Sequence, residues 1–133
     1  MKHVIVVEDD PHNALLFRRV LERRGGFRVT VTESAEELFR HCHGGGVALV
    51  LLDVSLSHTV WQGRAVNGVD VCRLLKADPL TVGIPVLLAT AHAMSGDAER
   101  LLAGSGAEDY VSKPVVDHVA FLEQVKSLVA EAA

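Results

Sequence analysis

The chain has few of the features that mark secreted, membrane-spanning or nucleic-acid-binding proteins. Its two cysteines, Cys42 and Cys72, form no recognisable framework, and both fall on predicted helices, so we expect buried reduced thiols. The first apolar run, residues 4–7, is far too short for a signal peptide or a membrane span. Lysine and arginine occur in no run longer than a pair, and the formal net charge is −4. We therefore expect a cytoplasmic protein that binds neither nucleic acid nor a membrane surface.

Aromatic residues are also scarce. They make up 5% of the chain, whereas apolar residues as a whole make up 49%, which predicts a core of aliphatic strands and helices and excludes general disorder. A chain of 133 residues is the size of one ordinary domain and can bury roughly two-thirds of the surface that its unfolded form exposes. We expect a single domain over residues 1–133, with no output domain.

One apolar run dominates the sequence. Residues 48–52, with the sequence ALVLL, are followed directly by Asp53. Successive apolar residues are typical of a strand buried on both faces, as in a parallel sheet covered by helices. Asp53 would then stand at the carboxyl end of this strand, where open α/β sheets bind their ligands.

Four further apolar runs of strand length occur, and the segments between them have helical spacing. The expected strands are residues 3–7, 27–31, 48–53, 84–89 and 110–112. The expected helices are residues 11–24, a helix carrying Leu38 and Phe39, 69–77, 96–103, and a last helix that begins after Asp117. Five strands alternating with five helices predict an α/β fold, a doubly wound flavodoxin-like (βα)5 sheet with parallel strands in the order 2-1-3-4-5.

The segment after the central strand, residues 54–67, has no clear periodicity. We expect a long loop there, and loops of this length are usually functional or mobile. It contains Trp61, the only tryptophan of the chain. Trp61 could report on events at Asp53, or it could pack passively on the start of the helix at 69–77.

Polar residues end four of the five strands. Glu8 and Asp9 follow the first strand, Asp53 ends the third, Thr90 follows the fourth and Lys113 follows the fifth. In the expected strand order the first and third strands are neighbours, so the three carboxylates should converge. Such a cluster requires a compensating cation, and oxygen ligands with room for water suit Mg²⁺.

A carboxylate beside Mg²⁺ and a lysine is arranged to attack phosphorus. The metal and the ammonium group neutralise charge on the transferring phosphoryl group, and a hydroxyl group completes its surroundings. The sequence therefore predicts that Asp53 is the nucleophile, with Lys113 and Thr90 beside it.

These residues resemble the signature of receiver domains, the phosphorylated modules of two-component response regulators. The resemblance covers essentially the whole chain, and two further segments, residues 71–76 and 96–100, resemble stand-alone regulators without an output domain. The motifs that carry it are VEDD at residues 7–10, LD at 52–53, ATA at 89–91, GAEDY at 106–110 and KP at 113–114.

The resemblance implies a Mg²⁺-dependent phosphorylation switch rather than an enzyme with its own output. Asp53 would accept a phosphoryl group from a phosphohistidine of a sensor histidine kinase or a phosphotransfer protein, and the domain would assist only its own phosphorylation and dephosphorylation. The implied metal ligands are Glu8, Asp9, Asp53 and the backbone carbonyl of Ser55. Lys113 would pair with Asp53 next to a cis Lys113–Pro114 bond.

The resemblance also implies how the signal leaves the site. Thr90 would move toward the phosphoryl oxygens, and the ring of Tyr110 would swing inward behind it. The change would reach a downstream protein through the face formed by the fourth helix, the fifth strand and the fifth helix, and a homodimer is compatible with this arrangement. His92 could position water for phosphoryl loss, or it could be an ordinary loop histidine.

Two positions depart from the family pattern. Ser57 stands where receivers usually have a proline after the acceptor, and Gly68, which matches the glycine that opens the third helix, comes later than usual. The loop beside Asp53 is therefore enlarged. We expect the chemistry to be retained, because no ligand residue is lost.

Three alternatives compete with a phosphorylated receiver. An aspartate-based phosphatase of the haloacid-dehalogenase type would require a second carboxylate at the position of Ser55. A flavin carrier of the same fold would require a phosphate-binding loop after the first strand, where this chain has three acids. A degenerate receiver would act as a constitutive binding module, although Asp9, Asp53, Thr90 and Lys113 are all present.

Overall fold

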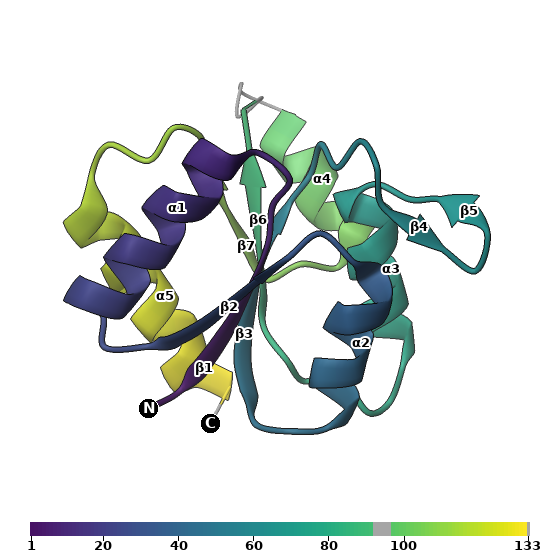
Figure 1. Ribbon diagram of the computed structural model, residues 1–133, viewed down its shortest axis with the longest axis horizontal. Helices are drawn as coiled ribbons and strands as arrows, with labels where there is room; N and C mark the ends of the chain where they lie inside the picture. The colour runs from purple at the N-terminus through teal and green to yellow at the C-terminus, as the bar shows by residue number, and fades with distance from the viewer. Residues whose placement is uncertain (92–96, 133) are drawn as a thin grey trace.

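The computed structural model describes residues 1–91 and 97–132 and shows a central parallel sheet between two layers of helices (Figure 1). The five strands of the sheet are β1 (His3–Val7), β2 (Arg28–Thr32), β3 (Val47–Asp53), β6 (Val86–Thr90) and β7 (Asp109–Ser112). Their order is β2-β1-β3-β6-β7, and every neighbouring pair is parallel. This is the doubly wound order that the sequence predicts, with β2 at one edge.

The helices divide between the two faces of the sheet. They are α1 (Pro11–Arg19) with its continuation η1 (Val20–Arg24), α2 (Ala35–His43), α3 (Gly68–Ala77), α4 (Asp97–Ser105) and α5 (His118–Ala132). In Figure 1, α1 and α5 lie on one side of the sheet and α2, α3 and α4 on the other. Among the described residues, no helix is long and apolar enough to span a bilayer.

Each face of the sheet has its own apolar core, because side chains of a strand alternate between faces. Val4, Val6 and Leu51 pack with Phe17 and Phe121 of the α1 and α5 layer. On the opposite face, residues such as Ile5, Val50 and Leu52 pack with α2 and α3. The central strand is thus buried on both sides, as its unbroken apolar sequence indicates. Both cysteines are free thiols buried in the second core, as expected.

The helix boundaries follow local sequence signals. Asp10 caps α1 by accepting a hydrogen bond from the His12 N–H, and Pro11 occupies the first helical position. The expected helix at 11–24 is continuous but ends in a π-helical turn, η1. A full capping box is present at α3, where the side chains of Asn67 and Asp70 each accept a hydrogen bond from the other's backbone N–H.

The prediction of an irregular loop over residues 54–67 is wrong in part. The segment contains a small antiparallel hairpin, β4 (Val60–Trp61) and β5 (Arg64–Ala65), which projects beyond α3 (Figure 1). Gln62 and Gly63 form its two-residue turn, and both have positive φ, at 51° and 80°. A two-residue strand has too few residues to show alternation, so this pairing has no signal in the sequence.

The hairpin is fixed at its base and along its side. The Val66 N–H donates to the Thr59 carbonyl at 3.0 Å, and the Thr59 hydroxyl donates to the Glu33 carbonyl at 3.0 Å. The Trp61 ring packs on Phe39 of α2, with centroids 4.5 Å apart. The Trp61 ring therefore has a partner on α2, and packing on the start of α3, one of the two alternatives from the sequence, stays a prediction.

Candidate functional site

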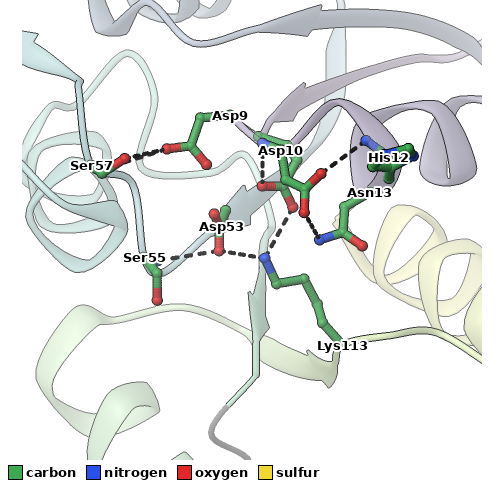
Figure 2. Close-up of polar contacts among 9 residues, drawn as sticks. Asp9, Asp10, His12, Asn13, Asp53, Ser55, Ser57 and Lys113 are labelled. Atoms are coloured by element: carbon green, nitrogen blue, oxygen red, sulfur yellow. Dashed lines mark hydrogen bonds and ion pairs between the residues drawn. The ribbon is translucent and has the colours of Figure 1, made fainter.

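Asp53 is the last residue of β3 and is 2% exposed. Its Oδ1 accepts hydrogen bonds from the Lys113 Nζ at 2.9 Å and from the Ser55 backbone N–H at 3.2 Å (Figure 2). Lys113 follows β7, which lies two strands away from β3 in the sheet. The long lysine side chain reaches back across the carboxyl edge of the sheet to the carboxylate at its centre.

The three consecutive acids after β1 have three different partners. Glu8 is buried, and its two oxygens accept from the Lys113 Nζ at 3.1 Å and from the Asp10 backbone N–H at 3.2 Å. Asp9 is half-buried, and its Oδ2 accepts two hydrogen bonds from Ser57. Asp10 is exposed and caps α1. Only the first two acids of the run therefore face the site.

Glu8, Asp9 and Asp53 form a cluster suited to a cation. Each offers one carboxylate oxygen, and these oxygens lie within 4.8 Å of one another. The single ammonium group of Lys113 cannot balance three carboxylates, so the cluster has an excess of negative charge. Oxygen-only donors at this spacing fit a hard dication such as Mg²⁺, which keeps several water ligands.

The pKa values of these groups reflect the crowding of charge. Burial and the neighbouring Asp53 carboxylate raise the pKa of Glu8 to about 7. Burial acts to lower the pKa of Lys113, but its bonds to Asp53 and Glu8 outweigh this and raise it. Burial acts to raise the pKa of Asp9, but hydrogen bonds from the Ser57 backbone and side chain outweigh this and lower it. The lysine thus stays charged, and Glu8 takes up a proton more readily than an ordinary glutamate.

Thr90 and Tyr110 lie on the two strands beyond Asp53. Thr90 ends β6, is 1% exposed, and its carbonyl accepts the Lys113 backbone N–H at 2.9 Å. Tyr110 is half-buried on β7 and packs against the core on the α2 and α3 face. Register pairs Tyr110 with Leu88 of β6, and Thr90 with Ser112 of β7. His92 lies outside the described residues.

The family model for the response regulator receiver domain matches residues 4–126 of this chain. The chain belongs to the response regulator receiver domain family. The site just described lies within the matched range, and the receiver fold accounts for the convergence of its carboxylates at one edge of the sheet.

Similar proteins agree with this assignment. The polar-differentiation response regulator DivK of Brucella ovis is 36% identical over 131 residues, which is 98% of each chain, and DivK of Brucella anthropi is 35% identical over the same share. A solved structure of a putative response regulator from Chloroflexus aurantiacus J-10-fl has a TM-score of 0.81 at 26% identity and covers 97% of this chain and 98% of its own.

A second solved structure is similar in fold. It is the receiver domain of the sensor histidine kinase PA1611 from Pseudomonas aeruginosa PAO1, with a TM-score of 0.79, 24% identity, and coverage of 97% of this chain and 98% of its own. That structure has a magnesium ion coordinated in its active-site cleft. The fold prediction is confirmed by these similarities and by the observed strand order.

Most predicted site residues of this receiver do come together. Glu8, Asp9, Asp53 and Lys113 form one connected cluster, and the Lys113–Pro114 peptide bond is cis. Ser55 contacts Asp53 through its backbone N–H, and its predicted role as a carbonyl ligand stays a prediction. Ser57, which the sequence marks only as a departure from the family pattern, hydrogen-bonds to Asp9, a contact that the sequence does not predict.

Proposed function

We propose that Asp53 is the phosphoryl acceptor of this receiver. Receiver domains interact with histidine kinases or phosphotransfer proteins, and the proposed donor is a phosphohistidine of such a protein. The observation that carries the proposal is the position of Asp53, which ends the central strand in contact with Lys113 and within 4.8 Å of two further carboxylates. The proposed location is the cytoplasm, where the ATP that supplies such a donor is available and thiols such as Cys42 stay reduced.

The proposed metal is Mg²⁺, held by carboxylate oxygens of Glu8, Asp9 and Asp53 and by the backbone carbonyl of Ser55. When bound, Mg²⁺ would offset negative charge on the carboxylates and on the phosphoryl oxygens. The oxygen-only donor set supports this choice, as does the magnesium in the receiver of the Pseudomonas kinase.

In the proposed reaction, a carboxylate oxygen of Asp53 forms a bond to phosphorus as the bond from phosphorus to the histidine nitrogen breaks. The histidine leaves with the electron pair of that bond, so no external reactant is needed. Lys113 stays protonated because of its ion pairs, and its Nζ donates to an oxygen at the reacting centre. We propose no catalytic output beyond phosphorylation and dephosphorylation of the domain itself.

We also propose that Thr90 and Tyr110 transmit the state of Asp53 to the surface. A cavity of about 380 Å³ lies between α3 and α4 beside Thr90, and its lining includes Leu101 and Gly104. This space supports a movement of the Thr90 side chain without displacement of the sheet. The resulting change would be read by a downstream protein, or by a second copy of the domain, on the face of α4, β7 and α5.

The test is phosphorylation by an acyl phosphate in the presence of Mg²⁺, measured as intact mass. We expect one added phosphoryl group on the unmodified sequence and none on Asp53→Asn. Asp109→Asn is the matched control and should be labelled normally. Asp109 is the first residue of β7 and so lies at the amino ends of the strands, away from Asp53 at the carboxyl ends. Full labelling of Asp53→Asn would reject the acceptor assignment. Absence of labelling in all three proteins would favour the alternative of a constitutive binding module.

A further inference from the structure

Ser57 makes two hydrogen bonds to the same atom of Asp9. Its backbone N–H lies 3.1 Å from Oδ2 and its Oγ lies 2.9 Å from the same oxygen, although the residues are 48 positions apart. Receivers usually have a proline here, and proline has neither an N–H nor a hydroxyl group. Both contacts therefore depend on the residue that distinguishes this chain from the family pattern.

The contacts leave the other oxygen of Asp9 available. In Figure 2, the Asp9 oxygen that is not bonded to Ser57 lies on the side of Asp53, in the space shared by the carboxylates. Hydrogen bonds to Oδ2 also fix the rotation of the carboxyl group. A group that is already oriented loses less conformational entropy when it coordinates a metal.

Asp9 has greater need of such support than its neighbours. Glu8 and Asp53 are both 2% exposed, and both are held by Lys113. Asp9 is half-buried, and within residues 1–91 and 97–132 the side chain that hydrogen-bonds to it is that of Ser57. Without Ser57, the Asp9 carboxyl group would be free to turn toward water.

Ser57 is itself held in place by the enlarged loop. Two residues further on, Thr59 is buried, and its hydroxyl donates to the carbonyl of Glu33, just before the start of α2. The hairpin beyond it is fixed by the packing of Trp61 on Phe39. The loop therefore presents Ser57 from an anchored segment, although the Ser57 side chain is at the surface.

We propose that Ser57 is a positioning residue for the metal site. It holds Asp9 through Oδ2 so that the other oxygen faces the dication, and in this way the enlarged loop contributes to metal affinity. This inference rests on the proposed function, because it requires that Glu8, Asp9 and Asp53 bind Mg²⁺.

The test is titration with Mg²⁺ alone, by calorimetry and by amide chemical shifts, across three substitutions at residue 57. Ser57→Thr keeps both donors and should bind Mg²⁺ like the unmodified chain. Ser57→Ala keeps only the N–H and should weaken Mg²⁺ binding about threefold. Ser57→Pro removes both donors and should weaken it about tenfold, which is the lower end of the effect of losing an outer-shell partner. The chemical shift of the Ser57 amide should keep its hydrogen-bonded value as Mg²⁺ is added.

Ser127→Ala is the matched control. The Ser127 hydroxyl also donates to a carboxylate, that of Glu131 at 3.3 Å, but on the surface of α5. This variant should leave Mg²⁺ affinity unchanged. Urea unfolding of each protein shows whether the fold is intact, and the graded order of the three variants distinguishes positioning from a general loss of stability.

The outcomes separate this inference from the proposed function. A graded loss with recovery in Ser57→Thr supports the positioning role. Equal Mg²⁺ affinity across the series would overturn that role, although the metal site itself would stand. Tighter binding in Ser57→Ala would overturn it too, because it would show that serine competes with the metal for Asp9. If the unmodified chain binds no Mg²⁺, the proposed metal site fails and the inference fails with it.

Discussion

The Nζ of Lys113 lies 2.9 Å from Oδ1 of Asp53, across 60 positions of sequence. The same nitrogen lies 3.1 Å from Glu8 Oε1. One ammonium group thus bridges the carboxylates that end β1 and β3, and its removal should have opposite effects on metal binding and on phosphorylation.

We expect Lys113→Met to bind Mg²⁺ more tightly but to be phosphorylated about 100-fold more slowly. Binding tightens because the acidic cluster loses the positive charge of Lys113, and phosphorylation slows because a donor is lost at the reacting centre. Calorimetry and the rate of labelling by an acyl phosphate measure the two effects. Lys126→Met, a change at an exposed lysine of α5, should alter neither. Weaker Mg²⁺ binding in Lys113→Met would contradict the electrostatic account.

The raised pKa of Glu8 predicts a pH dependence of stability in the absence of metal. In the folded protein this pKa is about 7, against an ordinary value of 4.5, so the folded state binds more protons between these values. The free energy of unfolding should therefore fall as pH rises from about 4.5 to 7. In Glu8→Gln this decrease should be absent.

The measurement is urea unfolding of both proteins at several pH values. The stability of Glu8→Gln relative to the unmodified chain should grow through this window and level off above pH 7. Burial lowers the pKa of His3, so His3 makes a change of opposite sign below about pH 6.5. His3 is present in both proteins, and its effect cancels. Saturating Mg²⁺ should reduce the difference. A difference that does not vary with pH would contradict the prediction.

Thr90→Ala should separate phosphorylation from signal transmission. Asp53 and Lys113 remain, so the variant should still be labelled, but more slowly. A hydrogen bond to a charged group contributes roughly 1.5–3 kcal/mol, enough to shift a two-state equilibrium about ten- to a hundredfold. Amide shifts over residues 99–104 and 119–125, with and without beryllofluoride, should therefore be much smaller in Thr90→Ala. A full set of shifts in the variant would show that the signal leaves by another route.

Gly68→Ala should be strongly destabilising. A Cβ at Gly68 would lie 2.0 Å from the Asp53 carbonyl oxygen, a backbone atom of the central strand that cannot move aside. We expect a loss on the order of 3 kcal/mol or more in the free energy of unfolding. Gly83→Ala is the control, because a Cβ there would meet nothing within 4 Å, and it should change stability little. Urea unfolding distinguishes the two variants, and equal stability would refute the close-approach argument.

The parts of the site that the sequence predicts are those attached to regular strands. Asp53 ends one apolar run and Glu8 directly follows another. Their place at the carboxyl edge of a parallel sheet therefore follows from chain order alone. Lys113 is predictable for the same reason, although its bond to Glu8 requires knowledge of how far the side chain reaches across the sheet.

The contact between Ser57 and Asp9 could not be predicted in this way. It depends on the path of an irregular segment, where no periodicity constrains the backbone. The hairpin was missed for a related reason, since its strands are two residues long and its turn is Gln62-Gly63 rather than the more typical asparagine or aspartate followed by glycine. The π-helical turn η1 likewise has no sequence signal that distinguishes it from α-helix.

The hydrogen bond from the Val66 N–H to the Thr59 carbonyl closes the hairpin at its own base, so residues 60–65 form a unit whose two ends already meet. Because the entropy of closing a loop grows slowly with its length, shorter or longer segments can be exchanged there at small cost beyond the lost packing of Trp61. The acceptor, the acids and Ser57 all lie outside this unit. The sequence of this unit can therefore change, in evolution or by design, while the acceptor and the acids beside it stay the same.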